Sequence, residues 1–449
     1  MTVLFESLRR LADVRVSNVD KKSVEGHEPV RLCNYTDVYY NDVITNDMTF
    51  MEATASRQQI ENFRLQPGDT VITKDSETAD DIGVPAYVGS SAGDLVCGYH
   101  LAMLRPGERL HPKFLFWVMA SSYGREALSV NASGVTRYGL TYGAIKDVAI
   151  PVPPIEEQRR IADFLDEQVA RIDEAISAIV VERELQSEVP GAVFTDLLSE
   201  WIPGFADHLG LETGALSNGW RVDKLGHVLR QFTNGYVGPT RDILIDDGIP
   251  YIQSLHIKKG VIDFERRPYF VSEEWHNERP RIHLGVGDVL IVQTGDIGSI
   301  AVVPEGFMDA SCHALLIARP RQDLVSSGYL GEYLRSPLGR AQLLSRATGA
   351  LHPHLESGIK ESPVVIPPQA EQMRIVHEMT SVRESMANID SWLSGQEQLL
   401  QERKRSLITS AVTGALDVTT TSALTGPWVS STATAPQLVS FPQAVGVAL

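Results

Sequence analysis

The residue types in this chain that could bind a metal ion are few and scattered. His352 and His354 flank a proline, and His100 and His313 each lie close to a cysteine. Each of these histidines could be proposed as a metal ligand, but the sequence shows no third clustered ligand for them. Ordinary surface or core histidines are therefore the favoured interpretation, and no metal site is predicted.

Motifs for covalent chemistry are also missing from the sequence. Glu156-Glu157 and Glu273-Glu274 are adjacent pairs, and on a helix adjacent side chains diverge by about 100°, so neither pair is placed for joint acid–base work. The sequence contains no phosphate-binding GxxxxGK[ST] loop, no GxSxG elbow, no HExxH pair and no Asn/Asp-Pro-Pro-Tyr tetrapeptide. We therefore predict a chain that is not an enzyme and binds no cofactor of its own.

The overall charge excludes one class of nucleic-acid binder. The 449 residues include 40 Lys and Arg against 57 Asp and Glu, a net charge of −17. A polybasic, histone-like protein would carry the opposite sign. The only cysteines, Cys33, Cys97 and Cys312, are far apart, which predicts a reducing environment without a disulfide framework. With no apolar run of membrane-spanning length, the chain is expected to be cytoplasmic.

The elements that position these residues are repeated along the chain at a period of about 215 residues. Five short matches recur in the same order, which indicates a tandem duplication. They pair Gly68-Asp69 with Gly287-Asp288, Gly124-Arg125 with Gly339-Arg340, Ala132-Ser133-Gly134 with Ala347-Thr348-Gly349, Ile145-Lys146 with Ile359-Lys360, and Pro153-Pro154…Glu157-Gln158 with Pro367-Pro368…Glu371-Gln372.

Each repeat begins with short β-type runs and ends in a helix that opens at a Pro-Pro pair. Apolar residues recur every seven positions along both helices, as expected for seams that pack on each other. In an isolated helix, packing on a globular core would be equally plausible. Pro190-Gly191 predicts the end of the first helix. The seam residues are Leu165, Ile172, Ile179, Met379, Met386, Leu393, Leu400 and Leu407.

These patterns predict an α+β protein with two tandem globular domains, each followed by a long helix, and an antiparallel coiled coil between the helices. The expected boundaries are a first globular domain (1–152), a first helix (153–200), a linker (201–218), a second globular domain (219–366), a second helix (367–417) and a disordered tail (418–449).

Two domains that each lead into a Pro-Pro…Glu-Gln helix make the chain resemble the specificity (S) subunit of type I restriction–modification systems. Ser217-Asn218-Gly219-Trp220 looks like that family's entry into a second recognition domain. Glu402–Ile408, followed by Ala411–Gly414, looks like its closing segment. The resemblance covers about residues 1–417. The combination of motifs is specific evidence for this family, whereas any one of the motifs alone would be weak evidence.

The resemblance implies that each globular domain is a target recognition domain that reads one half of a bipartite sequence in double-stranded DNA. It implies that the helices hold these domains apart and dock two modification subunits, which carry the S-adenosylmethionine-dependent methyltransferase. Restriction subunits would carry the translocase and nuclease that need ATP and Mg²⁺. The S subunit itself is then non-catalytic and has no cofactor.

On this interpretation, DNA contacts should come from polar and cationic residues in matching loops of the two repeats, although a solvated loop residue is as plausible at any single position. The candidates are Arg31, Asn34, Thr73, Lys74, Thr136, Arg137, Tyr138, Gln253, Ser254, Lys258, Lys259, Gln293, Thr294, His352 and His354.

At the helix entries, Gln158, Arg159, Gln372 and Arg374 are candidates for contact with the modification subunits, with local capping as the equally weighted alternative. Two other functions stay open from sequence alone. One is an S-like scaffold or decoy that binds modification subunits without recognising DNA, which the acidic composition would suit. The other is an enzyme whose motifs are unfamiliar.

Overall fold

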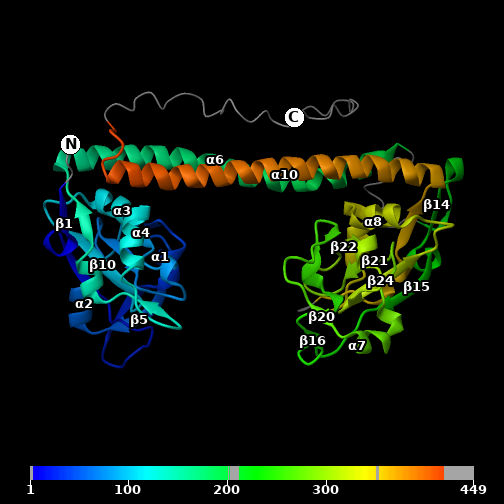
Figure 1. Cartoon of the computed structure of the whole chain (residues 1–449), viewed down its shortest axis with the longest axis horizontal. Coiled ribbons are helices and arrows are strands. Elements are labelled where there is room, and N and C mark those ends of the chain that lie inside the picture. Colours follow the sequence, from blue (N-terminus) through cyan, green and yellow to red (C-terminus); the bar gives the residue numbers. More distant parts are fainter. Residues whose placement is uncertain (1–3, 201, 203–211, 350–352, 419–449) are drawn as a thin grey trace. The chain divides into compact units, whose positions relative to one another are not determined.

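The computed structural model describes residues 4–200, 202, 212–349 and 353–418 (Figure 1). The chain forms two compact units. Unit 1 contains the described residues up to Val180 together with those from Leu393 onward, and unit 2 contains Val181–Trp392. Both units include parts of the two long helices, α6 (Ile155–Ser199) and α10 (Gln369–Val412). Each unit therefore combines one globular half with a segment of each helix.

Unit 1 is built around a five-stranded sheet in the order β2-β10-β6-β8-β4, with smaller sheets β5-β3-β9, β1-β12 and β11-β7. Its strands are β1 (Phe5–Ser7), β2 (Ala12–Val16), β3 (Glu28–Cys33), β4 (Val43–Ile44), β5 (Met51–Ala55), β6 (Thr70–Thr73), β7 (Asp75–Ser76), β8 (Pro85–Val88), β9 (Leu95–Cys97), β10 (Leu101–Pro106), β11 (Tyr138–Gly139) and β12 (Ala149–Pro151). Its shorter helices are α1 (Tyr35–Tyr39), α2 (Arg57–Phe63), α3 (Pro112–Ala120), α4 (Ser122–Ser129) and α5 (Tyr142–Lys146).

Unit 2 contains a four-stranded sheet in the order β15-β24-β21-β22, with β16-β20-β17-β23, β13-β14-β25 and β18-β19 beside it. Its strands are β13 (Gly214–Ala215), β14 (Arg221–Lys224), β15 (Leu229–Asn234), β16 (Leu244–Ile245), β17 (Ile249–Ile252), β18 (Ile257–Lys258), β19 (Val261–Ile262), β20 (Phe270–Val271), β21 (Val289–Val292), β22 (Ile300–Val302), β23 (Ser311–Cys312), β24 (Leu315–Pro320) and β25 (Pro363–Ile366). The shorter helices are α7 (Glu273–Asn277), α8 (Ser327–Arg335) and α9 (Pro337–Leu344).

The two globular halves have the same topology, as the repeat predicts. The antiparallel order β2-β10-β6-β8 of unit 1 corresponds to β15-β24-β21-β22 of unit 2, and the parallel pair β3-β9 corresponds to β17-β23. Strands β6 and β21 are buried along their whole length, which explains their nearly continuous run of apolar or β-branched residues. The α+β fold with two tandem domains and long helices is therefore confirmed.

Within each unit the segments of α6 and α10 run antiparallel and in contact (Figure 1). In unit 1, Lys404 of α10 pairs with Asp173 of α6 at 2.8 Å, and the earlier residue Leu165 shares a buried cluster with the later residue Ile408. In unit 2, Arg183 pairs with Asp390 at 2.8 Å. The predicted seam residues are all buried or half-buried. A coiled coil along the full length of both helices remains a prediction.

The prediction that Pro190 and Gly191 end the first helix is wrong, because α6 continues to Ser199 with Pro190 inside it. Proline removes one helical hydrogen bond, but burial beyond it compensates: Phe194 and Leu198 are at most 1% exposed in the core of unit 2. Gly191 also serves this packing, since a Cβ there would lie 3.0 Å from Pro337 of α9. Tertiary contacts therefore keep the helix going past two unfavourable residues.

Several predicted segments lie partly outside the described residues. In the predicted linker, 201 and 203–211 are not described, while β13 occupies Gly214–Ala215 and pairs with β14. All but the first residue of the predicted tail also falls outside, and so does His352. The three cysteines are buried free thiols.

Candidate nucleic-acid interface

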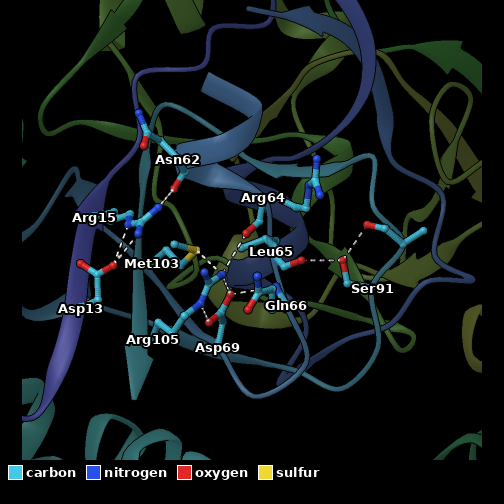
Figure 2. A network of polar contacts seen from close by, with 11 residues as sticks. Asp13, Arg15, Asn62, Arg64, Leu65, Gln66, Asp69, Ser91, Met103 and Arg105 are labelled. Atoms are coloured by element: carbon cyan, nitrogen blue, oxygen red, sulfur yellow. Dashed lines mark hydrogen bonds and ion pairs between the residues drawn. The ribbon is translucent and has the colours of Figure 1, made fainter. Parts of the chain in front are cut away.

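The repeated Gly-Asp turn anchors the strand that carries each candidate loop. In unit 1, the Asp69 carboxylate is 1% exposed and accepts two hydrogen bonds of 2.7 Å from the Arg105 guanidinium (Figure 2). It also accepts a hydrogen bond of 2.8 Å from the backbone N–H of Gln66, and Arg105 donates to the carbonyl of Arg64 at 2.9 Å. A buried carboxylate needs this complete pairing, which fixes the start of β6.

Unit 2 repeats the arrangement. Asp288 is 1% exposed, accepts from Arg319 at 3.1 Å and from the backbone N–H of Gly285 at 2.8 Å. Gly68 and Gly287 both have positive φ angles, +96° and +83°, which glycine adopts without strain. The Gly-Asp motif therefore has a structural role. It fixes β6 and β21 in the same way, so the candidate loops that follow these strands begin at equivalent places in the two units.

A hollow of about 500 Å³ lies at the end of β21 in unit 2. Three of the predicted residues, Gln293, Thr294 and His354, line it together. The sequence analysis missed the polar residues that complete the lining from β15 and from the 3₁₀ helix η9 (Ser357–Glu361). The other lining residues are Phe232, Thr233, Asn234, Val237, Leu316, Leu355, Glu356, Ser357 and Lys360.

One backbone hydrogen bond holds the segment that contains His354 against the end of β21, and a pair of backbone hydrogen bonds joins His354 to Thr348. The backbone N–H of Leu355 donates to the carbonyl of Gln293 at 3.0 Å, and Thr348 and His354 exchange backbone hydrogen bonds. The His354 ring lies 2.8 Å from the Glu356 carboxylate. The hollow thus presents an amide, a hydroxyl, an imidazole and, through Lys360, an ammonium group on one scaffold. A sequence signal existed for Lys360, which belongs to a repeated Ile-Lys pair.

Unit 1 builds an equivalent surface with different side chains. The backbone N–H of Leu140 donates to the carbonyl of Lys74 at 2.8 Å, matching the Leu355–Gln293 contact of unit 2. The β7–β11 ladder then carries Tyr138 opposite Ser76, and Thr136 and Arg137 are exposed just before it. The predicted residues Lys74 and 136–138 are thereby brought together.

The Lys74 side chain also links this loop to a second, smaller hollow of about 180 Å³. Its ammonium lies 4.6 Å from the Tyr99 ring centroid and 3.2 Å from the Asp75 carboxylate, which also contacts His100 at 2.7 Å. Predicted Asn34 lines this hollow, with Asp20, Lys21, Tyr35, Gly98, Tyr99 and His100, which the sequence analysis did not select.

Other predicted contact residues have partners within the chain. Thr73 is fully buried and accepts a hydrogen bond from the N–H of Val84. The Arg31 guanidinium makes two hydrogen bonds to Asp94, at 2.9 and 3.0 Å, and this pairing lowers the pKa of the Asp94 carboxyl.

In unit 2, the remaining candidates sit around the turn that follows β17. Gln253 and Ser254 lie in a tight turn in which the backbone N–H of Gln253 donates to His256. Lys258 is half-buried, and Lys259 pairs with Asp390 of α10. None of these four lines the larger hollow.

The glutamines at the helix entries anchor the helices from inside. Gln158 and Gln372 are at most 1% exposed. Each accepts a hydrogen bond from a backbone N–H and donates two to backbone carbonyls. Local capping, the alternative weighed above, therefore describes both. Arg159 and Arg374 instead lie at the surface, paired with glutamates of their own helix.

In the described part of the chain, no group of three or more His, Cys, Asp and Glu residues is placed to hold a metal ion. The same residues include no helix that is long and apolar enough to cross a membrane.

Comparisons with known proteins show which proteins this chain resembles. Residues 11–180 match the family described as "Type I restriction modification DNA specificity domain". The chain is 24% identical over 301 residues to the EcoBI specificity subunit of Escherichia coli, an alignment that covers 65% of this chain and 63% of the relative. It is 21% identical over 387 residues to the EcoKI specificity subunit of Escherichia coli K12, an alignment that covers 83% of this chain and 79% of the relative.

A solved structure of a type I R-M system, titled for its complex assembly and conformational transition, contains a chain with the same fold. The TM-score is 0.67 at 19% identity, over 92% of this chain and 98% of the other. The two globular domains and long helices of this chain thus have the same fold as a chain of that system. Residues 11–180 therefore resemble this family's specificity domain, and the chain is similar to specificity subunits of type I restriction–modification systems.

Proposed function

We propose that this chain is the DNA-recognition subunit of a type I complex, and that each globular half reads one part of a bipartite sequence in double-stranded DNA. The observation that carries the proposal is the paired loop surface: the equivalent ends of β6 and β21 are each joined to a later loop, and these loops gather side chains that can hydrogen-bond base edges. The names of the relatives, specificity subunits of restriction enzymes, support it.

The larger hollow has suitable chemistry for reading base edges. The side-chain amides of Asn234 and Gln293 can each donate to and accept from adenine, while Lys360 can donate to guanine or to a phosphate. Val237 is 67% exposed beside them and can pack on a thymine methyl group. In unit 1, the exposed Arg137 offers the corresponding cation. We assign sequence discrimination to these residues in preference to the buried or paired candidates.

The reaction itself is assigned to partner subunits. Two modification subunits would bring S-adenosylmethionine, and restriction subunits would bring ATP and Mg²⁺, in the cytoplasm. Arg159 and Arg374 are the proposed contacts to the modification subunits. The helix region 155–200 carries 12 acidic and 4 basic side chains, so phosphate attraction should come mainly from the partners. The isolated chain is therefore expected to bind DNA weakly.

The direct test is a map of adenine methylation in cells that express this chain with the modification subunit of its own system. The wild-type chain should yield a two-part motif with a fixed spacer. Asn234→Ala and Gln293→Ala should relax one half of the motif and leave the other half unchanged. Gln58→Ala, an exposed glutamine of α2 outside both hollows, serves as the control. Relaxation of both halves, or of neither, would contradict the assignment.

The helices are proposed to set the spacer. Adding seven residues to α6 after Val180 and seven to α10 before Leu393 lengthens each helix by about 10 Å. At about 3.4 Å per base pair, the spacer should grow by about three base pairs while both half-sites stay the same. Altered half-sites at a constant spacer would refute this role.

A further inference from the structure

The hairpin β18–β19 of unit 2 has an unusual turn. Its two central residues, Lys259 and Gly260, both have positive φ angles, +46° and +88°. Two-residue hairpins of this kind favour Asn-Gly, because most side chains are unfavourable at the first position. A lysine in this conformation persists only where the surroundings hold it. The question is therefore what holds Lys259.

The Lys259 side chain is held by the long helices. Its ammonium lies 2.8 Å from one carboxylate oxygen of Asp390 in α10, and the other oxygen accepts a hydrogen bond of 2.8 Å from Arg183 in α6. Both cations lower the pKa of the Asp390 carboxyl. One aspartate thus joins the hairpin to α10 and α6 within unit 2.

The next residue of the turn is tied to the helices by a separate route. Arg335 of α8 donates to the carbonyl of Gly260 at 3.4 Å and to the Glu332 carboxylate at 2.6 Å. Glu332 is 6% exposed and accepts two further hydrogen bonds, of 2.6 and 2.9 Å, from Arg383 of α10. Both turn residues are therefore connected to α10, one directly and one through a buried ion pair.

We propose that Lys259 is a positioning residue: through Asp390 it fixes the angle of the second globular half on the helices and so narrows the range of DNA spacer lengths that the protein accepts. This inference rests on the proposed function. It replaces, for Lys259, the DNA contact predicted from sequence. An ammonium engaged with Asp390, on a turn that lies outside the larger hollow, is placed to orient the domain.

The test uses a substitution that improves the turn while it removes the Lys259–Asp390 ion pair, called the tether below. Lys259→Asn creates the favoured Asn-Gly turn, so the variant should keep the wild-type melting temperature. Asp390→Asn removes the tether from the helix side, at a residue far from the recognition loops in sequence and on a different element. Lys259→Arg keeps the cation and should behave as wild type.

Methylation maps of the full complex give the readout. Lys259→Asn and Asp390→Asn should each raise methylation about two- to fivefold at sites whose spacer is one base pair longer or shorter than in the wild-type motif. This is the range that loss of an exposed ion pair permits. The half-sites should not change. Lys224→Asn is the matched control, because it removes a 2.7 Å pair with Glu361 inside the globular half and should leave the spacer unchanged.

Two results would overturn the inference. One is an unchanged spacer distribution in both tether variants. The other is a phosphate-contact pattern: Lys258→Asn and Lys259→Asn weaken DNA binding alike and flatten its salt dependence, while Asp390→Asn has no effect. Failure of the proposed function would look different, because the wild-type complex would then give no two-part motif at all.

Discussion

The distal part of α6 should be essential to the stability of unit 2, and Phe194→Ala tests this directly. Phe194 follows Pro190 on α6, is 1% exposed and packs against Tyr329 and Tyr333, with ring centroids 6.1 and 6.4 Å away. Truncating a fully buried phenylalanine costs about 3–5 kcal/mol from lost burial and the remaining cavity. Lost contact with two aromatic rings places the expected value in the upper part of this range.

Hydrogen exchange read by mass spectrometry resolves the effect by unit. Peptides from α8 in unit 2 should lose protection by at least a hundredfold, since 1.4 kcal/mol corresponds to a factor of ten. Peptides from α3 in unit 1 provide the internal reference. Val181→Ala, at a residue of the same helix that is 54% exposed, should change exchange little. A Phe194→Ala protein with wild-type protection in α8 would show that α6 does not belong to this core.

Three further predictions concern buried groups. Gln372→Ala leaves one N–H and two carbonyl groups without their partner and should lower the stability of unit 2 to urea by about 2–4 kcal/mol; a loss below 1 kcal/mol would contradict the anchoring role. Gly339→Ala should cost at least about 1–3 kcal/mol, because its Cβ would lie 2.0 Å from the Tyr333 carbonyl, whereas Gly358→Ala, with open space around it, should be nearly neutral in thermal melts. Burial lowers the pKa of His256, His276 and His313 in unit 2, so below the ordinary histidine pKa of about 6.5 the unfolded chain binds protons more readily than the folded chain. The contribution of these histidines to stability should therefore be complete above that pH and fall as the pH decreases. A melting temperature that stays flat between pH 7 and 5 would refute this.

The sequence by itself was sufficient for the architecture. Short β-type runs, helices that begin at Pro-Pro and an ordered set of repeated motifs are patterns within short segments. Such patterns can be recognised from the sequence without knowledge of the fold. The Gly-Asp and Gly-Arg repeats marked real equivalences, although their role is structural: at Gly124 and Gly339 a Cβ would collide with a backbone carbonyl oxygen at 2.2 and 2.0 Å.

The roles of individual polar residues needed the tertiary structure. A glutamine at a helix entry looks like a surface residue, yet Gln158 is fully buried. Lys259 looks like a phosphate ligand, yet it pairs with an aspartate 131 positions away. Asn234 and Lys360 meet at one hollow only because strand pairing brings their segments together. Each of these facts depends on contacts between distant parts of the chain.

The same reason explains why α6 passes Pro190. Helix propensity is a local quantity, and by that measure Pro190-Gly191 is a stop signal. Burial of Phe194 and Leu198 in the core of unit 2 outweighs it, as does the close approach of Gly191 to α9. The sequence alone determined that each of two globular domains is followed by a long helix. Only the tertiary structure decided that each compact unit contains parts of both helices, because long-range packing energy, and not local preference, assigns a helix to its core.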